Sequence, residues 1–193
     1  GRTDILESLS VYLPNLEPIS SVLESGFADG SAMVELPALL LSGPALSAGA
    51  ASIPMGGVPL DENQTFAALI GEQHRTVISA LASERRVVAH AFGVRKLPSD
   101  DTWIATHAGA PRGAGSRHVP DRASANALLR DGVIGSLVPL ISAADLAGVD
   151  VPMTRSIVTL AGTVLGADVA AAGRRLETIG ITANDLDDAR KAL

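Results

Sequence analysis

Apolar residues recur at three-, four- and seven-residue spacings along much of the chain, which is the period of an amphipathic α-helix. The longest uninterrupted pattern covers residues 64–92, and Gly93 follows it as a residue suited to a helix C-terminus. A shorter apolar pattern over residues 32–41 predicts a buried helix, with Ser31 as its candidate N-cap and Pro37 as a kink or break. Helices are therefore the expected structure of the first half.

The second half repeats the pattern in shorter segments, which glycine and proline residues separate. A polar, glycine-rich loop with a basic balance over residues 106–126 precedes them. The sequence has no sustained alternation of apolar and polar residues, which is the pattern of a strand. We therefore predict an all-α fold, a single multi-helix domain over residues 1–193. The other expected helices are a short one around Ile5, Leu6 and Leu9 and those over residues 123–131, 133–147, 152–167, 168–179 and 183–193.

Composition limits the core, the compartment and the partners. Only five residues are aromatic (three Phe, one Trp and one Tyr), so the core must be built from Leu, Val, Ile and Ala. The chain has no cysteine, which excludes a thiol nucleophile and disulfides and predicts a reducing, cytoplasmic location. The net charge of −6 disfavours nucleic acid and anionic membranes as partners. Residues 36–60 carry no charge, but the prolines and glycines among them favour a loop over a membrane-spanning helix.

Several motifs that carry chemistry are absent from the sequence. A dinucleotide site needs a strand, a glycine-rich turn and a helix N-terminus in succession, and no segment has that order. No Gly-x-Ser-x-Gly motif is present, so a hydrolase serine has no support. The four histidines have no spacing that places two metal ligands on one helix face, so we expect no metal site.

Five segments carry a family resemblance through their order and spacing. In the second half they are Leu-Val-Pro-Leu at 137–140, Ala-Gly-Val-Asp-Val-Pro-Met-Thr at 147–154, and Gly-Arg-Arg-Leu-Glu-Thr-Ile-Gly-Ile at 173–181. In the first half, Val-Leu-Glu-Ser at 22–25 and Ser-Glu-Arg at 83–85 fit the same pattern. Together they resemble the C-terminal helical domain of the octopine/nopaline (opine) dehydrogenases, a domain similar to the C-terminal domain of 6-phosphogluconate dehydrogenase.

The resemblance implies one part of a two-domain oxidoreductase. In such an enzyme a Rossmann domain binds NAD or NADP, and the helical domain binds the substrates. The reaction is the reductive condensation of a 2-oxo acid with an amino acid. The sequence contains no Rossmann domain, so the resemblance implies a separate nucleotide-binding domain or subunit, and an inactive chain in isolation. It also implies a homodimer.

The catalytic histidine of that family has no counterpart in this chain. In the family it follows an asparagine by four residues and lies just before a proline-containing segment; the corresponding positions are Ser31 and Glu35, with Pro37 downstream. Imidazole exchanges protons near neutral pH, whereas a carboxylate does so only in a buried setting. The resemblance therefore implies Glu35 as the catalytic candidate. The structural alternative is a charge near a helix start that is paired or faces solvent.

The family's substrate-binding arginine is also displaced. It precedes by five residues an aspartate that lies before the Leu-Val-Pro segment; anchored on Asp131, that position holds Asn126. Arg122 or Arg130 could supply, from a neighbouring position, the guanidinium that clamps a substrate carboxylate. The substrate-binding candidates are thus Arg122, Asn126, Arg130 and Asp131. Arg117, Arg122 and Arg130 could also form an anion site or belong to a solvated basic loop.

Two other interpretations stay open. The chain could be a non-catalytic helical interaction or dimerisation module that has lost the catalytic groups, or an unrelated helical bundle that binds a small anion. Helix ends alone account for Gly148, Gly180 and Pro152. Likewise, Glu84 and Arg85 on the long helix are more typical of surface or interhelical ion pairs than of catalytic groups.

Overall fold

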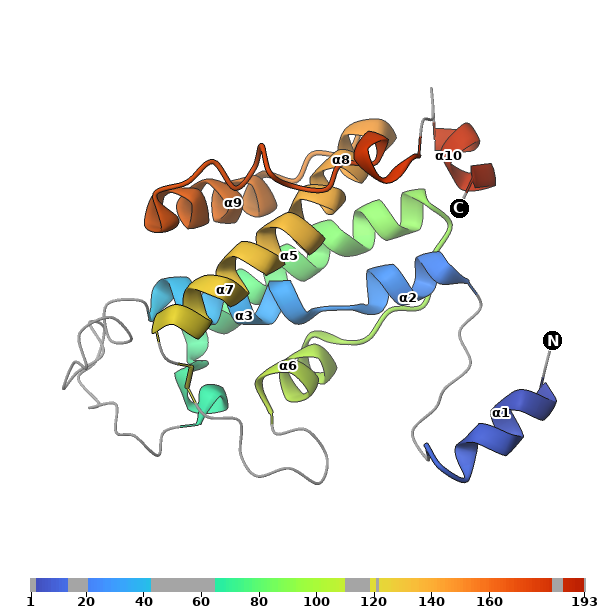
Figure 1. The fold of residues 1–193 in the computed structure, drawn as a ribbon, viewed down its shortest axis with the longest axis horizontal. Coiled ribbons are helices and arrows are strands. Elements are labelled where there is room, and N and C mark those ends of the chain that lie inside the picture. The colour runs from blue at the N-terminus through green and yellow to red at the C-terminus, as the bar shows by residue number, and fades with distance from the viewer. Residues whose placement is uncertain are drawn as a thin grey trace.

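The computed structural model describes residues 3–13, 21–42, 65–109, 119–120, 122–181 and 186–192. These residues form helices and turns without a β-strand among them, so the predicted all-α class is confirmed. Short helices of other types are η1 (Phe66–Leu69, 3-10), η2 (Val133–Leu137, π) and η3 (Glu177–Ile179, 3-10). The α-helices (Figure 1) are α1 (Thr3–Ser10), α2 (Val22–Ala28), α3 (Ser31–Leu41), α5 (Glu72–Ala91), α6 (Asp100–Ala108), α7 (Arg122–Gly132), α8 (Val138–Ala147), α9 (Pro152–Leu165) and α10 (Leu186–Ala192).

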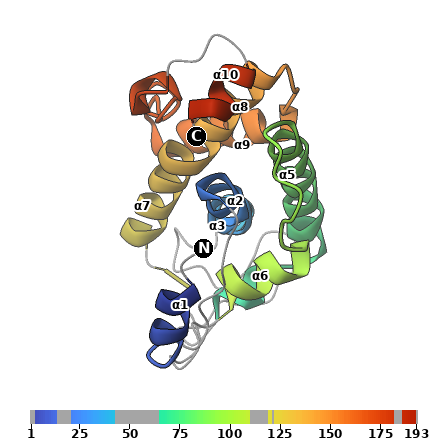
Figure 2. The same cartoon turned by 90° about the vertical axis from the view of Figure 1, so that its right-hand side faces the viewer.

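Helix α3 is the centre of the fold. Figure 2 shows α2 and α3 in the middle of the molecule, with α5 on one side and α7 on the other. Helix α3 contacts α5, α6, α7 and α9. Its Met33, Val34 and Leu36 have no exposed surface, because other helices enclose them. A helix that is buried on most sides needs apolar residues on most of its positions. The buried residues around it are mostly aliphatic, as the composition predicts, with Trp103 and Phe66 as the largest exceptions.

The long predicted helix over residues 64–92 is shorter than expected. It consists of η1, a break at Gly71, and α5. Gly71 is the N-cap residue with an extended backbone, and its N–H donates to Nδ1 of His74 at 3.2 Å. The predicted C-terminus is confirmed: Gly93 has φ of 87°, and the following Val94 N–H bonds to the carbonyl of Ala89 at 2.9 Å.

The prediction of two helices separated at Gly132 is wrong. A single helix runs over Arg122–Ala147, and Gly132 has ordinary helical angles within it. Glycine at this position serves packing, since a Cβ there would lie 2.5 Å from Cδ1 of Leu36 on α3. The helix widens to the π form at η2, directly before Pro139. Proline has no N–H, and its ring collides with the carbonyl four residues earlier, so a π turn is one way to relieve the conflict.

The segment after α9 is not the helix predicted over residues 168–179. It forms turns and the short η3, because its backbone bonds to the widened helix instead. The N–H of Arg174 donates to the carbonyl of Ile134 at 3.0 Å, and the N–H of Leu176 donates to Oγ of Ser142 at 3.1 Å. A Cβ on Gly173 would lie 2.4 Å from Cβ of Val138, so glycine permits this close approach.

Two local predictions also need correction. Ser31 is not the N-cap of α3: Gly30 holds that position, and Oδ1 of Asp29 accepts the Ser31 N–H at 3.0 Å. Pro37 lies inside α3 without ending it. Helix α6 was not predicted, although Ser99 caps it by accepting the Thr102 N–H at 3.2 Å. Residues 182–185, which include the start of the helix predicted over 183–193, and residues 43–60 of the uncharged run lie outside the described residues.

One described helix is long and apolar enough to cross a membrane. It is the helix over Arg122–Ala147, whose most apolar window has a mean hydropathy of 1.4. Of that window, 50% is buried within the fold. A core helix has the same properties, so this helix by itself does not favour a membrane location.

Candidate functional site

Glu84 of α5 reaches the N-terminus of α9. Its carboxylate accepts hydrogen bonds from the N–H groups of Met153 and Thr154 at 2.7 and 2.8 Å and from the Thr154 hydroxyl at 2.7 Å. The first N–H groups of a helix have no partner inside it, and they carry partial positive charge. Glu84 therefore caps α9, and its charge is matched by the helix it binds.

Arg85, the next residue, reaches the opposite kind of helix end. Its Nε and Nη2 donate to the backbone carbonyls of Phe27 and Gly26, both at 2.9 Å. These carbonyls belong to the last turn of α2, where partial negative charge collects. Arg85 is only 4% exposed, so this bonding ties α2 firmly to α5.

Trp103 of α6 completes the attachment of α2. Its Nε1 donates to the carbonyl of Ala28 at 2.6 Å. A Cβ on Gly30 would lie 2.3 Å from Cδ1 of this indole, so the turn between α2 and α3 can pass beneath Trp103 only with glycine at that position. Three consecutive carbonyls, those of residues 26–28, are thus bonded by side chains from α5 and α6.

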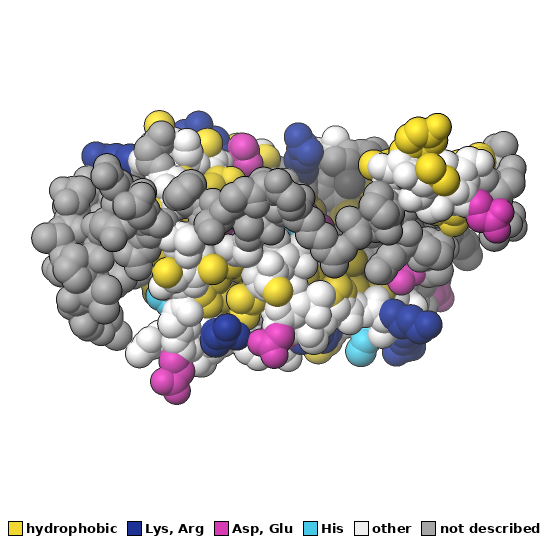
Figure 3. Space-filling model, turned by 90° about the horizontal axis from the view of Figure 1, so that it is seen from below, with side chains coloured by type: hydrophobic (Ala, Val, Ile, Leu, Met, Phe, Trp, Pro, Cys, Tyr) yellow, Lys and Arg dark blue, Asp and Glu magenta, His cyan; other side chains and the backbone are white. Residues whose placement is uncertain are grey.

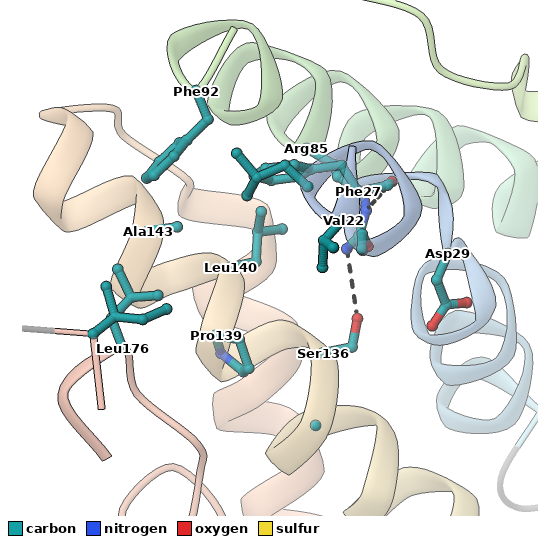
Figure 4. Close-up of a pocket in the computed structure, with 14 residues that line it drawn as sticks. Val22, Phe27, Asp29, Arg85, Phe92, Ser136, Pro139, Leu140, Ala143 and Leu176 are labelled. Carbon is teal, nitrogen blue, oxygen red and sulfur yellow. Dashed lines mark hydrogen bonds between the residues drawn. The ribbon is translucent and has the colours of Figure 1, made fainter. Parts of the chain in front are cut away.

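A cavity of about 340 Å³ lies beside Arg85, lined by residues of α2, α5, η2, α8 and the segment after α9. Figure 4 shows the apolar side chains of Phe92, Ala143 and Leu176 on one side of it. Arg85 and Ser136 lie on the other side. The cavity is therefore mostly apolar, with its polar groups gathered at one end.

Ser136 contributes the hydroxyl at that end. It lies in η2, the π turn before Pro139, and its Oγ accepts from Nη1 of Arg85 at 3.5 Å. This distance is at the long limit for a hydrogen bond, whereas bonds between ionised partners are normally about 2.7–2.9 Å. Nη1 is therefore the least well satisfied nitrogen of the guanidinium.

The charge of Arg85 is balanced only in part. Among the described residues no carboxylate forms an ion pair with it; Asp29, also at the cavity wall, binds the Ser31 N–H instead. Burial lowers the pKa of Arg85 to about 10, and the negative charge of Asp29 acts in the opposite direction. Arg85 remains a cation at neutral pH, buried beside an apolar space.

The residues proposed from the family resemblance lie elsewhere. Glu35 is half-buried on α3 and does not line the cavity. Arg122, Asn126 and Arg130 share one face of α7 at four-residue spacing, with both arginines exposed, and Asp131 is exposed beside them. The structure thus places all four substrate-binding candidates on α7, three of them on one face, and Glu35 on the neighbouring helix α3. Their roles stay predictions, and Arg117 lies outside the described residues.

Sequence reasoning gave Arg85 and Ser136 no binding role. Arg85 was expected in a surface or interhelical ion pair, and Ser136 had no assigned role at all. The only local signal was Pro139 within a helical pattern, which indicates a distortion in the preceding turn. Neither the cavity nor the bonds from Arg85 to α2 follow from local sequence, because they join residues more than 50 positions apart.

Neither a cluster of metal-binding side chains nor a Rossmann-type turn is found among the described residues. No cluster of three or more His, Asp or Glu side chains lies within them. They also contain no β-strand followed by a glycine-rich turn, which is the phosphate-binding arrangement of a Rossmann domain. On the face in Figure 3, Lys and Arg are interspersed with Asp and Glu, so the described part of that face does not gather charge of one sign.

Comparisons with known proteins supply no identification. No protein-family model matches the chain, and no curated protein matches it. The function must therefore be inferred from the sequence pattern and the geometry.

Proposed function

We propose that this chain is the helical, substrate-binding domain of an opine-type dehydrogenase, an NAD(P)-dependent oxidoreductase that joins a 2-oxo acid to an amino acid. A Rossmann domain or subunit would bind the nucleotide, since the described residues do not fit it. In this proposal the fold is similar to the C-terminal helical domain of 6-phosphogluconate dehydrogenase. The enzyme is a homodimer and is located in the cytoplasm.

The supporting observation is that the five segments carrying the resemblance meet in one packed unit. Residues 83–85 bond to both 147–154, through Glu84, and to α2, which begins at 22–25, through Arg85. Residues 173–181 lie on the helix that contains 137–140, through Gly173 against Val138. The five segments thus belong to elements of one packed core, as the segments of a shared domain would.

In this proposal, Glu35 is the acid–base group that exchanges a proton with the oxygen or nitrogen bonded to the carbon that receives hydride. Arg122, Asn126, Arg130 and Asp131 bind the substrates on α7. Helices α3 and α7 contact each other directly, which keeps the two sets on adjacent elements. In this proposal a nucleotide-binding domain or subunit completes the site.

Assay of NAD(P)H oxidation tests the proposal, with this chain joined to its nucleotide-binding partner and a panel of 2-oxo acids and amino acids as substrates. We expect turnover only when both substrates are present. Glu35→Gln should reduce kcat by about a hundredfold or more, because it removes the general acid–base group. Glu7→Gln, an exposed change on α1, is the matched control and should leave kcat unchanged. Absence of turnover with every substrate pair contradicts the proposed enzyme. An unchanged kcat in Glu35→Gln contradicts the proposed role of Glu35.

A second candidate is a non-catalytic interaction module. The observation that favours it is that none of the five proposed site residues lines the cavity described above. It predicts binding of a protein partner without NAD(P)H oxidation, so the same assay separates the two functions.

A further inference from the structure

The guanidinium of Arg85 has one nitrogen that its structural role does not explain. Nε and Nη2 hold the end of α2 through bonds of 2.9 Å to backbone carbonyls. Nη1 has only the 3.5 Å contact to Ser136, at the cavity wall (Figure 4). A buried cation gains most from a close anionic partner, and among the described residues no carboxylate lies within ion-pair distance of Arg85, although the charge of Asp29 acts on it.

The cavity next to Nη1 suits a small amphipathic ligand. Its volume of about 340 Å³ falls within the usual range of small-molecule sites, about 300–1,000 Å³. Phe92, Ala143 and Leu176 form an apolar wall across from Arg85 and Ser136. The cation favours a negatively charged head group at one end, and the apolar wall favours a hydrocarbon at the other.

We propose that this cavity binds an apolar monocarboxylate, such as a medium-chain fatty acid. The ligand carboxylate accepts from Nη1 of Arg85 and from the Ser136 hydroxyl, and its hydrocarbon lies along Phe92, Ala143 and Leu176. Asp29, at the cavity wall, repels additional negative charge, so a single carboxylate is preferred over a dicarboxylate or a phosphate. Binding here does not depend on the proposed dehydrogenase activity or on a nucleotide-binding partner.

Calorimetric titration of the chain with octanoate tests the proposal. We expect saturable binding at one site per chain. Octylamine, which reverses the charge, and octanedioate, which would bury a second carboxylate against the apolar wall, should bind at least about tenfold more weakly. Absence of saturable octanoate binding, or equal affinity for octanoate and octylamine, overturns the proposal.

Two variants that spare Arg85 locate the site. Ser136→Ala removes one of the two donors and should weaken octanoate binding about tenfold. Gly135 lines the cavity, and a Cβ added to it meets no atom within 4 Å, so Gly135→Leu places a bulky side chain at the cavity wall and should weaken octanoate binding at least about tenfold.

Ala127→Leu is the matched control, because Ala127 is exposed on α7 in the same continuous helix and does not line the cavity. It should keep the affinity of the unaltered chain. Circular dichroism confirms that each variant folds. Unchanged octanoate affinity in folded Ser136→Ala and Gly135→Leu proteins contradicts the assigned site.

Discussion

Glu84 and Arg85 are neighbours on α5, yet their surroundings differ. The carboxylate of Glu84 accepts three hydrogen bonds of 2.7–2.8 Å and closes the N-terminus of α9. The guanidinium of Arg85 makes two bonds of 2.9 Å to α2 and one of 3.5 Å beside a cavity. Consecutive residues of a helix point about 100° apart, which is why the two side chains reach different helices.

The charge of Glu84 is fully hydrogen-bonded within the fold, whereas the charge of Arg85 has one nitrogen with only a long hydrogen bond. All the hydrogen bonds that the Glu84 carboxylate accepts come from the N-terminal turn of α9. The carbonyls of α2 accept from two nitrogens of Arg85, and the third nitrogen, Nη1, has only the 3.5 Å contact to Ser136. We expect the difference to be visible in stability measurements, because the two sites lose different interactions when the charge is removed.

The largest expected effect comes from Arg85→Met, which keeps an unbranched side chain of similar length and removes the charge and the donors. It leaves the carbonyls of Gly26 and Phe27 without their side-chain donor. The free energy of unfolding, measured by urea titration, should fall by about 3 kcal/mol. Amide hydrogen exchange should show the loss of protection first in α2. A loss smaller than that of Glu84→Gln would reverse the comparison.

Glu84→Gln should have a smaller effect on the other helix end. The amide keeps one acceptor oxygen for the N–H groups of Met153 and Thr154 but loses the negative charge that the N-terminus of α9 favours. We expect about 1–2 kcal/mol of lost stability in the same urea titration. Hydrogen exchange should increase in the first turn of α9 and not in α2. Equal changes in both helices would show that the two residues act through α5 and not through the ends they bind.

His74 is another polar residue of α5, buried like Arg85, and it extends the comparison to a neutral group. Its Nδ1 accepts the Gly71 N–H at 3.2 Å, so the ring hydrogen lies on Nε2 and is donated to Oγ of the buried Ser42 at 3.2 Å. Burial lowers the pKa of His74 below its usual 6.5. The unfolded chain then binds a proton at a higher pH than the folded chain does.

The sign of the pH effect follows. The stability contributed by neutral His74 is fully present above pH 6.5 and is lost as the pH falls below that value and through the lower pKa of the folded protein. We therefore expect the unfolding free energy to fall as the pH is lowered from 7 to 5. In His74→Gln, whose amide oxygen can still accept the Gly71 N–H, that part of the pH dependence should disappear. An unchanged pH profile in the variant would assign the effect to other groups.

Local sequence was sufficient for much of the fold. The all-α class, the end of α5 at Gly93 and the start of α9 at Pro152 follow from periodicity and from the residues that suit helix ends. The errors arose where tertiary contacts outweigh local preference. Residues 168–179 have a helical pattern, but the Arg174 N–H bonds to Ile134 of another helix. Gly132 was interpreted as a break, although its small size serves contact with α3.

The candidate site was less predictable. Periodicity can place Arg85 on a helix, but not beside the carbonyls of Gly26 and Phe27, because that requires the packing of α2 on α5. The position of Ser136 depends on the π turn before Pro139, a distortion that the sequence indicates without giving its geometry. The five residues taken from the family resemblance depend on a partner, so the structure of this chain leaves them as predictions.

The carbonyls of Gly26, Phe27 and Ala28 each bond to a side chain of another helix, which fixes the number of residues in the segment from Gly26 to Gly30. Gly26 and Phe27 are bonded by α5 and Ala28 by α6, and Gly30 must follow at a fixed distance to pass under Trp103. Inserting or deleting a single residue within this stretch would shift every one of these partners out of register at once. Among related sequences, the interval from Gly26 to Gly30 should therefore keep a constant number of residues even where the side chains between them vary.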